Sequence, residues 1–264
     1  MRGRRRASVW RRRRRELTRW LLATLAALLI ALPVYLIAVG GMMSVREIHH
    51  QPPYLIPPNP TLAYYAQALG RMQGHVRNSV LIALGVMAVT LAAACPAAFA
   101  LAKLALPAAR LIQFLLTFAL MLPATALVIP LFLLFTRLQV INTLVSVVLA
   151  VAVFTIPFAT VVLTAYMRSI PTALLEAARI DGAGLLRTLW SVVLPVTRPA
   201  VATTAVFTFL LAWGDFIFSV SFLQERSLQP MSVGLYRFVG QFGVEWNQLM
   251  AASMLYSVPP ILAV

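Results

Sequence analysis

Acidic residues are scarce in this chain, and charge of either sign is scarce outside its first twenty residues. The 264 residues include 7 Asp and Glu against 22 Lys and Arg, and 11% are charged while 61% are hydrophobic. An average soluble domain is about half apolar and about a quarter charged. The composition therefore excludes an ordinary soluble domain and is typical of an integral membrane protein.

Cysteine pairs and nucleotide-binding motifs are also missing. Cys95 is alone, which excludes an intramolecular disulfide, and within an apolar stretch we interpret it as a packing residue. No Gly-x4-Gly-Lys-Ser/Thr motif occurs, so any ATP must be bound by another protein. His49 and His50 are adjacent, but no acidic or cysteine cluster at ligand spacing accompanies them, and we predict no metal site.

Long apolar runs occupy most of the chain. A bilayer core about 30 Å thick needs roughly 20 helical residues, so each long run predicts a transmembrane helix. A sixth run, residues 249–264, stops at the chain end after 16 residues, and we expect a helix that is cut short. The five runs of full length are residues 21–44, 79–102, 111–135, 143–167 and 199–223. We predict an all-α fold, a polytopic membrane helix bundle with six transmembrane helices over residues 21–264.

Arginine is concentrated at the N-terminus, where residues 1–20 carry ten. Such a segment in a soluble chain would suggest nucleic-acid binding. Directly before an apolar run, it is better explained by the preference of Lys and Arg for the cytoplasmic side and for anionic lipid headgroups. The following run is too long for a signal-peptide core. We therefore predict a cytoplasmic tail over residues 1–20 that contacts membrane lipid and no nucleic acid. The chain is expected to be a multi-pass inner (plasma) membrane protein.

The segment between the fourth and fifth full runs, residues 169–200, is too polar to span and too regular for a passive loop. Pro171 is well suited to begin a helix, because its missing N–H would be unpaired there anyway. Glu176 and Asp181 interrupt an apolar face, which predicts a short amphipathic helix. Gly182 and Gly184 are expected to end it, because glycine adopts the left-handed cap conformation without a side-chain penalty.

A second helix is predicted over residues 185–194, and Pro195 should break it. The two helices together form a helix-turn-helix that projects into the cytoplasm.

This segment resembles the EAA loop of binding-protein-dependent ATP-binding-cassette (ABC) permeases. That loop has the pattern EAA, three residues, Gly, nine residues, and then Ile-x-Leu-Pro. The residues that match are Glu176, Ala177, Ala178, Gly182, Leu194 and Pro195, with Val192 as one conservative departure. In that family the first helix of the loop is the coupling helix, which sits in a groove of the cytoplasmic ATPase. The resemblance implies that these residues and Asp181 couple the chain to an ATPase.

Further stretches resemble the carbohydrate branch, specifically the second permease of maltose-type importers. They are Asn78-Ser79, Ile129-Pro130-Leu131-Phe132, Ile141-Asn142-Thr143, Trp213-Gly214-Asp215-Phe216, Glu245-Trp246-Asn247 and Leu249-Met250-Ala251-Ala252-Ser253. The resemblance implies a sugar or a related polyol as solute. It implies three kinds of partner: an ATPase dimer that holds ATP and Mg, a second permease that is a homologue, and an extracytoplasmic solute-binding protein. It implies no bound cofactor and no enzyme activity in this chain.

Asp215 is the one formal charge inside the full-length apolar runs. A charged side chain near the bilayer centre costs about 2.5–3.5 kcal/mol on insertion scales and usually faces a bundle interior or a wet cavity. One hypothesis is that Asp215, with Trp213 and Phe216, borders the solute pathway, since aromatic faces stack on sugar rings and a carboxylate accepts hydroxyl hydrogen bonds. The alternative is a contact with a partner helix or the membrane interface, and both stay open.

Two other classes of membrane protein predict different residues inside the apolar runs. A secondary transporter driven by an ion gradient should carry several intramembrane ionisable groups or broken-helix repeats. A membrane-embedded enzyme should carry a cluster of catalytic polar residues. The apolar runs of this sequence favour neither of them.

Overall fold

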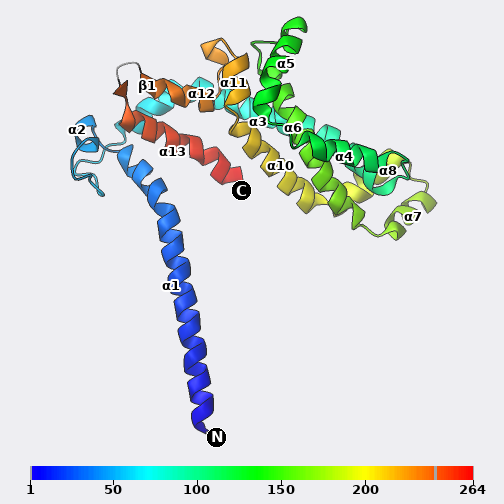
Figure 1. The fold of residues 1–264 in the computed structure, drawn as a ribbon, viewed down its shortest axis with the longest axis horizontal. Helices are drawn as coiled ribbons and strands as arrows, with labels where there is room; N and C mark the ends of the chain where they lie inside the picture. Colours follow the sequence, from blue (N-terminus) through cyan, green and yellow to red (C-terminus); the bar gives the residue numbers. More distant parts are fainter. Residues whose placement is uncertain (1, 241–242, 264) are drawn as a thin grey trace. The chain divides into compact units, whose positions relative to one another are not determined.

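We describe the protein from a computed structural model that covers residues 2–240 and 243–263, with side chains from Glu16 onward (Figure 1). Its α-helices are α1 Arg2–Gly40, α2 Val45–Ile48, α3 Ala63–Lys103, α4 Ala109–Ala119, α5 Ala124–Arg137, α6 Leu144–Arg168, α7 Thr172–Ile180, α8 Leu185–Thr188, α9 Leu194–Val196, α10 Arg198–Trp213, α11 Ile217–Phe222, α12 Met231–Leu235 and α13 Trp246–Ala263. The remaining elements are the π-helical turn η1 Leu189–Val193, two 3₁₀ turns (η2 Arg226–Leu228 and η3 Tyr236–Phe238), and the strands β1 Val239–Gly240 and β2 Gly243–Val244. The two strands pair antiparallel. The predicted all-α membrane fold is confirmed.

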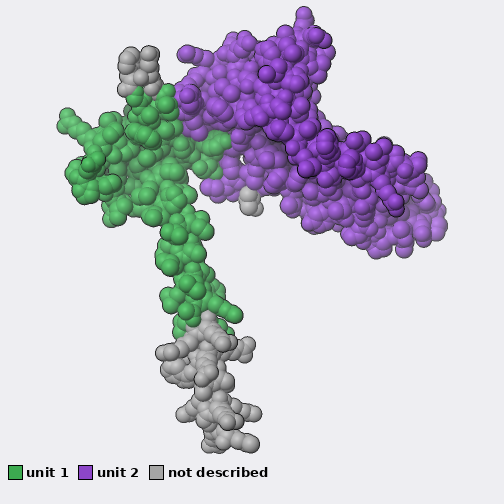
Figure 2. Space-filling model, in the orientation of Figure 1, with its two compact units in different colours: residues 1–70, 238–257 green, residues 71–237, 258–264 purple. Residues whose placement is uncertain are grey.

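The chain divides into two compact units, which Figure 2 shows in different colours. Unit 1 comprises residues 1–70 and 238–257, and unit 2 comprises residues 71–237 and 258–264. The backbone of the predicted N-terminal tail is part of α1, which continues through residue 20 without a break. The side chains of residues 1–15 lie outside the described part of the chain.

Three helices are long and apolar enough to cross a membrane: residues 16–40 of α1, the whole of α3 and the whole of α6. Two bent pairs raise the number to as many as five if each is one span. These pairs are α4 with α5, bent by 100°, and residues 185–196 with α10, bent by 84°. These helices support the prediction that the protein crosses the membrane several times.

Two of the predicted runs are not continuous helices. Residues 111–135 form α4 and α5, which are separated where Pro123 takes an extended conformation (φ −68°, ψ 131°) at the N-cap of α5. Proline has no N–H to continue the helical ladder, so the helix restarts after it. Residues 199–223 are likewise interrupted, because α10 ends at Trp213 and α11 begins at Ile217. Apolar length alone did not reveal either break.

Helix α6 is the centre of unit 2. It packs against α4, α5, α10 and α11. It also lies close to α3, since a Cβ added at Gly85 would meet Val148 at 3.0 Å. The hydroxyls of Thr90 and Thr155 join these two helices through a 2.6 Å hydrogen bond. Water does not drive helix association inside a bilayer, so small residues and side-chain hydrogen bonds such as these hold the helices together.

In unit 1, hydrogen bonds hold the segment between α1 and α3 in place. The Tyr65 hydroxyl donates to the Ala38 carbonyl at 2.8 Å. Ser44 and Glu47 form a reciprocal capping box at α2. The Ser44 N–H donates to the Glu47 carboxylate, and the Asn59 amide adds a second hydrogen bond; both lower the pKa of Glu47. The segment between α1 and α3 is therefore anchored at several points.

Candidate functional site

Helix α7 begins and ends as the sequence predicts. Pro171 precedes it with φ −58° and ψ 136°. Gly182 follows it with φ +75°, and the N–H groups of Gly182 and Ala183 donate to the carbonyls of Arg179 and Ala178 at 3.0 and 2.9 Å. This paired arrangement is a Schellman motif, which satisfies carbonyls that the helix end leaves unpaired. The prediction for Gly182 is confirmed.

Gly184 does not share that role. It has φ −70° and ψ 168° and is the N-cap of α8, so it begins the next helix instead of ending α7. The prediction for Gly184 was wrong because a helix end needs one residue in the left-handed conformation, and Gly182 is that residue.

The second helix of the loop is also longer than predicted. Helix α8 continues through the π-helical turn η1 into α9, which includes Pro195 and ends at Val196. The end falls at Thr197, whose backbone leaves the helical conformation (φ −95°, ψ 11°) while its N–H and hydroxyl both donate to the Val193 carbonyl, at 2.9 and 2.8 Å. An 84° bend into α10 follows. The break predicted at Pro195 therefore falls two residues later.

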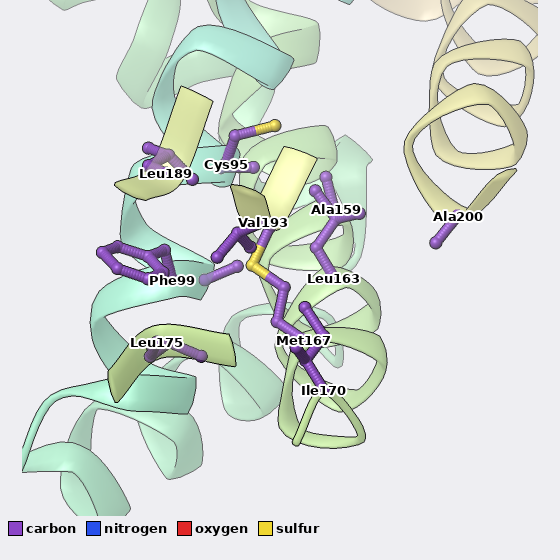
Figure 3. Close-up of a cluster of buried hydrophobic side chains, with 12 residues drawn as sticks. Cys95, Phe99, Ala159, Leu163, Met167, Ile170, Leu175, Leu189, Val193 and Ala200 are labelled. Carbon is purple, nitrogen blue, oxygen red and sulfur yellow. The ribbon is translucent and has the colours of Figure 1, made fainter. Parts of the chain in front are cut away.

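One face of this loop is packed against the membrane helices. Leu175 of α7 and Val193 of η1 are buried in a cluster that includes Phe99 of α3 and Met167 of α6, as Figure 3 shows. Ala178, the other buried residue of α7, lies on the same face as Leu175. A shift of α7 would disturb close-packed side chains of α3 and α6, because protein interiors have few voids to absorb it.

The opposite face of α7 is open to solvent. The predicted coupling residues Glu176, Ala177, Asp181 and Gly182 are exposed, as is Pro195, whereas Leu194 is half-buried and Ala178 is buried. Ile180 has 86% of its surface exposed. Glu176, Arg179 and Asp181 are exposed near it on the same helix, so the face offers an apolar contact among charged side chains of both signs. Such a mixture is typical of a protein interface, with an apolar centre and a polar edge.

Lys103, which was not among the predicted site residues, lies at the junction between α6 and α7. Its Nζ donates to the carbonyls of Arg168 and Ile170, at 3.3 and 2.5 Å. These carbonyls lie where α6 ends and the loop to α7 begins, and the last carbonyls of a helix have no partner within it. A cation also favours the negative end of the helix dipole. Lys103 therefore fixes the junction through which α7 is joined to α6.

Asp215 caps the short helix α11. Its carboxylate accepts hydrogen bonds from the Ser219 N–H and hydroxyl, at 2.9 and 2.8 Å, and from the Phe218 N–H at 3.4 Å. The Asp215 carbonyl accepts from the Ser232 hydroxyl at 2.6 Å. The charge is thus matched to unpaired N–H groups at a helix N-terminus.

The two aromatic neighbours of Asp215 lie in different surroundings. Trp213 is buried, with 2% of its surface exposed, and stacks on Phe209 at 5.7 Å between ring centroids. Phe216 is 39% exposed, and its ring lies 6.4 Å from that of Tyr236. Of the two aromatic residues predicted at the solute pathway, Phe216 therefore has the more accessible ring.

Two of the stretches that resemble the carbohydrate branch hold the segment that follows α11. The Asn142 side-chain oxygen accepts from the N–H groups of Gln224 and Glu225, at 3.0 and 2.9 Å. The Asn78 amide donates to the Ser227 carbonyl at 2.7 Å. These contacts span more than 80 residues of sequence, so no local pattern could have predicted them.

Among the residues that the structure describes, no three His, Cys, Asp or Glu side chains are grouped so that they could hold a metal ion. His50 instead stacks on Tyr54, with 4.3 Å between ring centroids.

The long apolar helices and the bent pairs define the class of protein as a multi-pass membrane protein. Residues 94–258 match the family described as binding-protein-dependent transport system inner membrane component, and the chain belongs to this family. The predicted resemblance is confirmed, and the chain is the permease subunit of an ABC importer.

Individual relatives agree with this family. The chain is 32% identical to the sulfoquinovosyl glycerol transport system permease protein SmoH of Agrobacterium fabrum, over 86% of this chain and 80% of the relative. It is 30% identical to the trehalose/maltose transport system permease protein MalG of Thermococcus litoralis, over 76% and 74%. Its fold matches a chain of a bacterial ABC transporter involved in alginate import, with a TM-score of 0.81, 21% identity and coverage of 95% and 94%.

The two loop glycines give a matched pair of substitutions. We expect Gly182→Ser to destabilise the loop by about 1–2 kcal/mol, the cost of a left-handed conformation for a residue with a side chain. Gly184→Ser should be neutral or slightly stabilising, because serine is favoured at an N-cap. No neighbouring atom lies within 4 Å of an added Cβ at either position. Thermal unfolding of the purified protein measures the change in stability of each variant. Equal unfolding midpoints for the two variants would contradict the assignment of the left-handed cap to Gly182.

Lys103→Met should loosen the junction before α7 by about 1 kcal/mol, because two carbonyls lose a charged donor at a site that is partly open to water. In the assembled transporter we expect ATP hydrolysis to persist while solute uptake per ATP falls. Arg110→Met is the control, since Arg110 is an exposed cation in the same predicted cytoplasmic region. Unchanged uptake per ATP in Lys103→Met would show that the junction does not depend on this side chain.

Proposed function

We propose that this permease carries a sugar or a related polyol and moves it when a separate ATPase dimer closes. The names of its relatives support the solute class, because they describe permeases for sulfoquinovosyl glycerol and for trehalose or maltose. The ion-gradient alternative gains no support from the structure or the relatives.

Helix α7 is the proposed docking element for the ATPase. The observation that carries this proposal is its two-sided character: Leu175 and Ala178 are buried against the membrane helices while Ile180 stands exposed between Glu176 and Asp181. A short amphipathic helix seated in a partner's groove is a common recognition mode. Nucleotide-driven movement of the groove would then reach α3 and α6 through the buried face.

ATP and Mg are proposed to bind the partner ATPase, because the sequence lacks the phosphate-binding loop. An ATPase dimer offers two grooves and this chain offers one α7, so we infer a second permease, a homologue of this chain. An extracytoplasmic solute-binding protein completes the proposed complex. The N-terminus is proposed to be cytoplasmic, on the basis of the ten arginines in residues 1–20.

The break between α10 and α11 is the proposed border of the solute pathway. It interrupts the apolar run 199–223, and irregular backbone at membrane depth is tolerated only where it is buried in protein or lines a wet cavity. The exposed ring of Phe216 would provide a stacking face for a sugar, while Trp213 supports α10 from within. The Asp215 carboxylate has acceptor sites beyond its hydrogen bonds to α11.

The docking role is tested by co-purification of the ATPase with the tagged chain. We expect the double variant Glu176→Arg with Ile180→Glu to lose the ATPase, because removing an interface anchor costs about 2 kcal/mol or more. Leu106→Glu is the control, since it places the same acid on a partly exposed leucine outside α7. The proposal is wrong if the membrane-inserted double variant retains the ATPase as the wild type does, or if no ATPase associates with the wild type.

The pathway role is tested by Asp215→Asn. Asparagine is also a favourable helix cap, so α11 should remain intact while the charge is lost. We expect uptake at limiting solute to fall about tenfold, the effect of weakening one charged hydrogen bond to solute. Assembly and ATP hydrolysis should persist, and Glu225→Gln should transport normally. If uptake by Asp215→Asn equals that of the wild type, the pathway role of the charge is excluded.

A further inference from the structure

An apolar groove lies in unit 2 between α3, the helical segment from α8 to α9, and the start of α10. Its volume is about 870 Å³, within the range of roughly 300–1,000 Å³ that holds a drug-sized ligand. Leu91 and Cys95 line it from α3, and Val201 lines it from α10. The ATPase-docking face of α7 contributes no residue to it.

The mouth of the groove combines two exposed apolar side chains with one cation. Leu186 and Trp190 line it with 69% and 66% of their surfaces exposed. Arg198 is the one charged residue among the described residues that line the groove. The guanidinium of Arg198 makes no hydrogen bond or ion pair with another described residue. Arg198 is exposed, so its guanidinium is accessible to an anion from outside the chain.

We propose that this groove is a binding site for an anionic phospholipid of the surrounding bilayer, which goes beyond the transport function. Its acyl chains lie along Leu91, Cys95 and Val201, and its phosphate pairs with Arg198. The guanidinium binds phosphate oxygens through two parallel hydrogen bonds, a geometry that lysine cannot supply. Trp190 lies at the mouth, and tryptophan is enriched where lipid headgroups meet the hydrocarbon.

A lipid matches this groove better than a transmembrane helix of a second copy would. Such a helix would have to place a carboxylate opposite Arg198, because burying one unpaired charge is strongly unfavourable. The full-length apolar runs contain one acidic residue, Asp215, and its carboxylate already accepts the hydrogen bonds of α11. A phospholipid supplies both the apolar chains and the anion in one molecule.

The test uses the full chain reconstituted in vesicles that contain either brominated phosphatidylglycerol or brominated phosphatidylcholine. Bromine quenches a nearby tryptophan, and the protein has five tryptophans, so the signal of Trp190 is the difference between the wild type and Trp190→Phe. We expect this difference signal to be quenched by phosphatidylglycerol at about a fivefold lower mole fraction than by phosphatidylcholine, the effect of one basic residue near an anionic lipid.

Arg198→Gln should abolish the preference, and Arg198→Lys should retain part of it. Arg187→Gln is the matched control, because Arg187 is exposed on α8 but does not line the groove. Equal quenching by the two lipids in the wild type would overturn the proposal. The proposal would also be overturned if Arg187→Gln lost the preference for phosphatidylglycerol as fully as Arg198→Gln, because this would indicate general attraction of the lipid to basic surface residues. The measurement is repeated on the transporter assembled with its second permease. Loss of Trp190 quenching there would show that a protein covers the groove, and would also overturn the proposal without affecting the ATPase-docking test.

Discussion

The structure depends on one constraint: a bilayer offers no water to backbone N–H and C=O groups, so every interruption of a helix must be satisfied by the protein itself. Asp215 meets this need at the break between α10 and α11, whereas the break at Pro123 has no side-chain cap. At the junction between α6 and α7, Lys103 donates to two carbonyls at the end of α6. Polar side chains thus satisfy part of the backbone that helix ends leave unpaired.

Helix α7 is amphipathic, and its two faces differ in burial. Helix α7 has too few apolar residues to be buried on all sides, so it buries Leu175 and Ala178 and leaves Ile180 outside. The buried face makes α7 part of the packed interior of unit 2, whereas the exposed face remains available to a partner. Transmission of movement requires both faces, and the Schellman motif at Gly182 sets where one face ends.

Charge is scarce in the apolar helices, and two charged side chains beside them have different surroundings. The Asp215 carboxylate accepts hydrogen bonds from N–H groups of α11. The Arg198 side chain is exposed at an apolar groove and has no such partner within the described residues. The first charge stabilises the start of α11, and the second is the basis of the lipid site that we propose.

The sequence by itself determined the helical membrane fold, the family, and the start and end of α7, because apolar length, proline and glycine act locally. It did not determine the 100° break at Pro123, the continuation of α9 through Pro195, or the N-cap role of Gly184. Only the tertiary structure decided the partners of Lys103 and those of Asn142. The physical reason is that these features depend on which backbone groups remain unpaired after packing, and packing joins residues far apart in the chain.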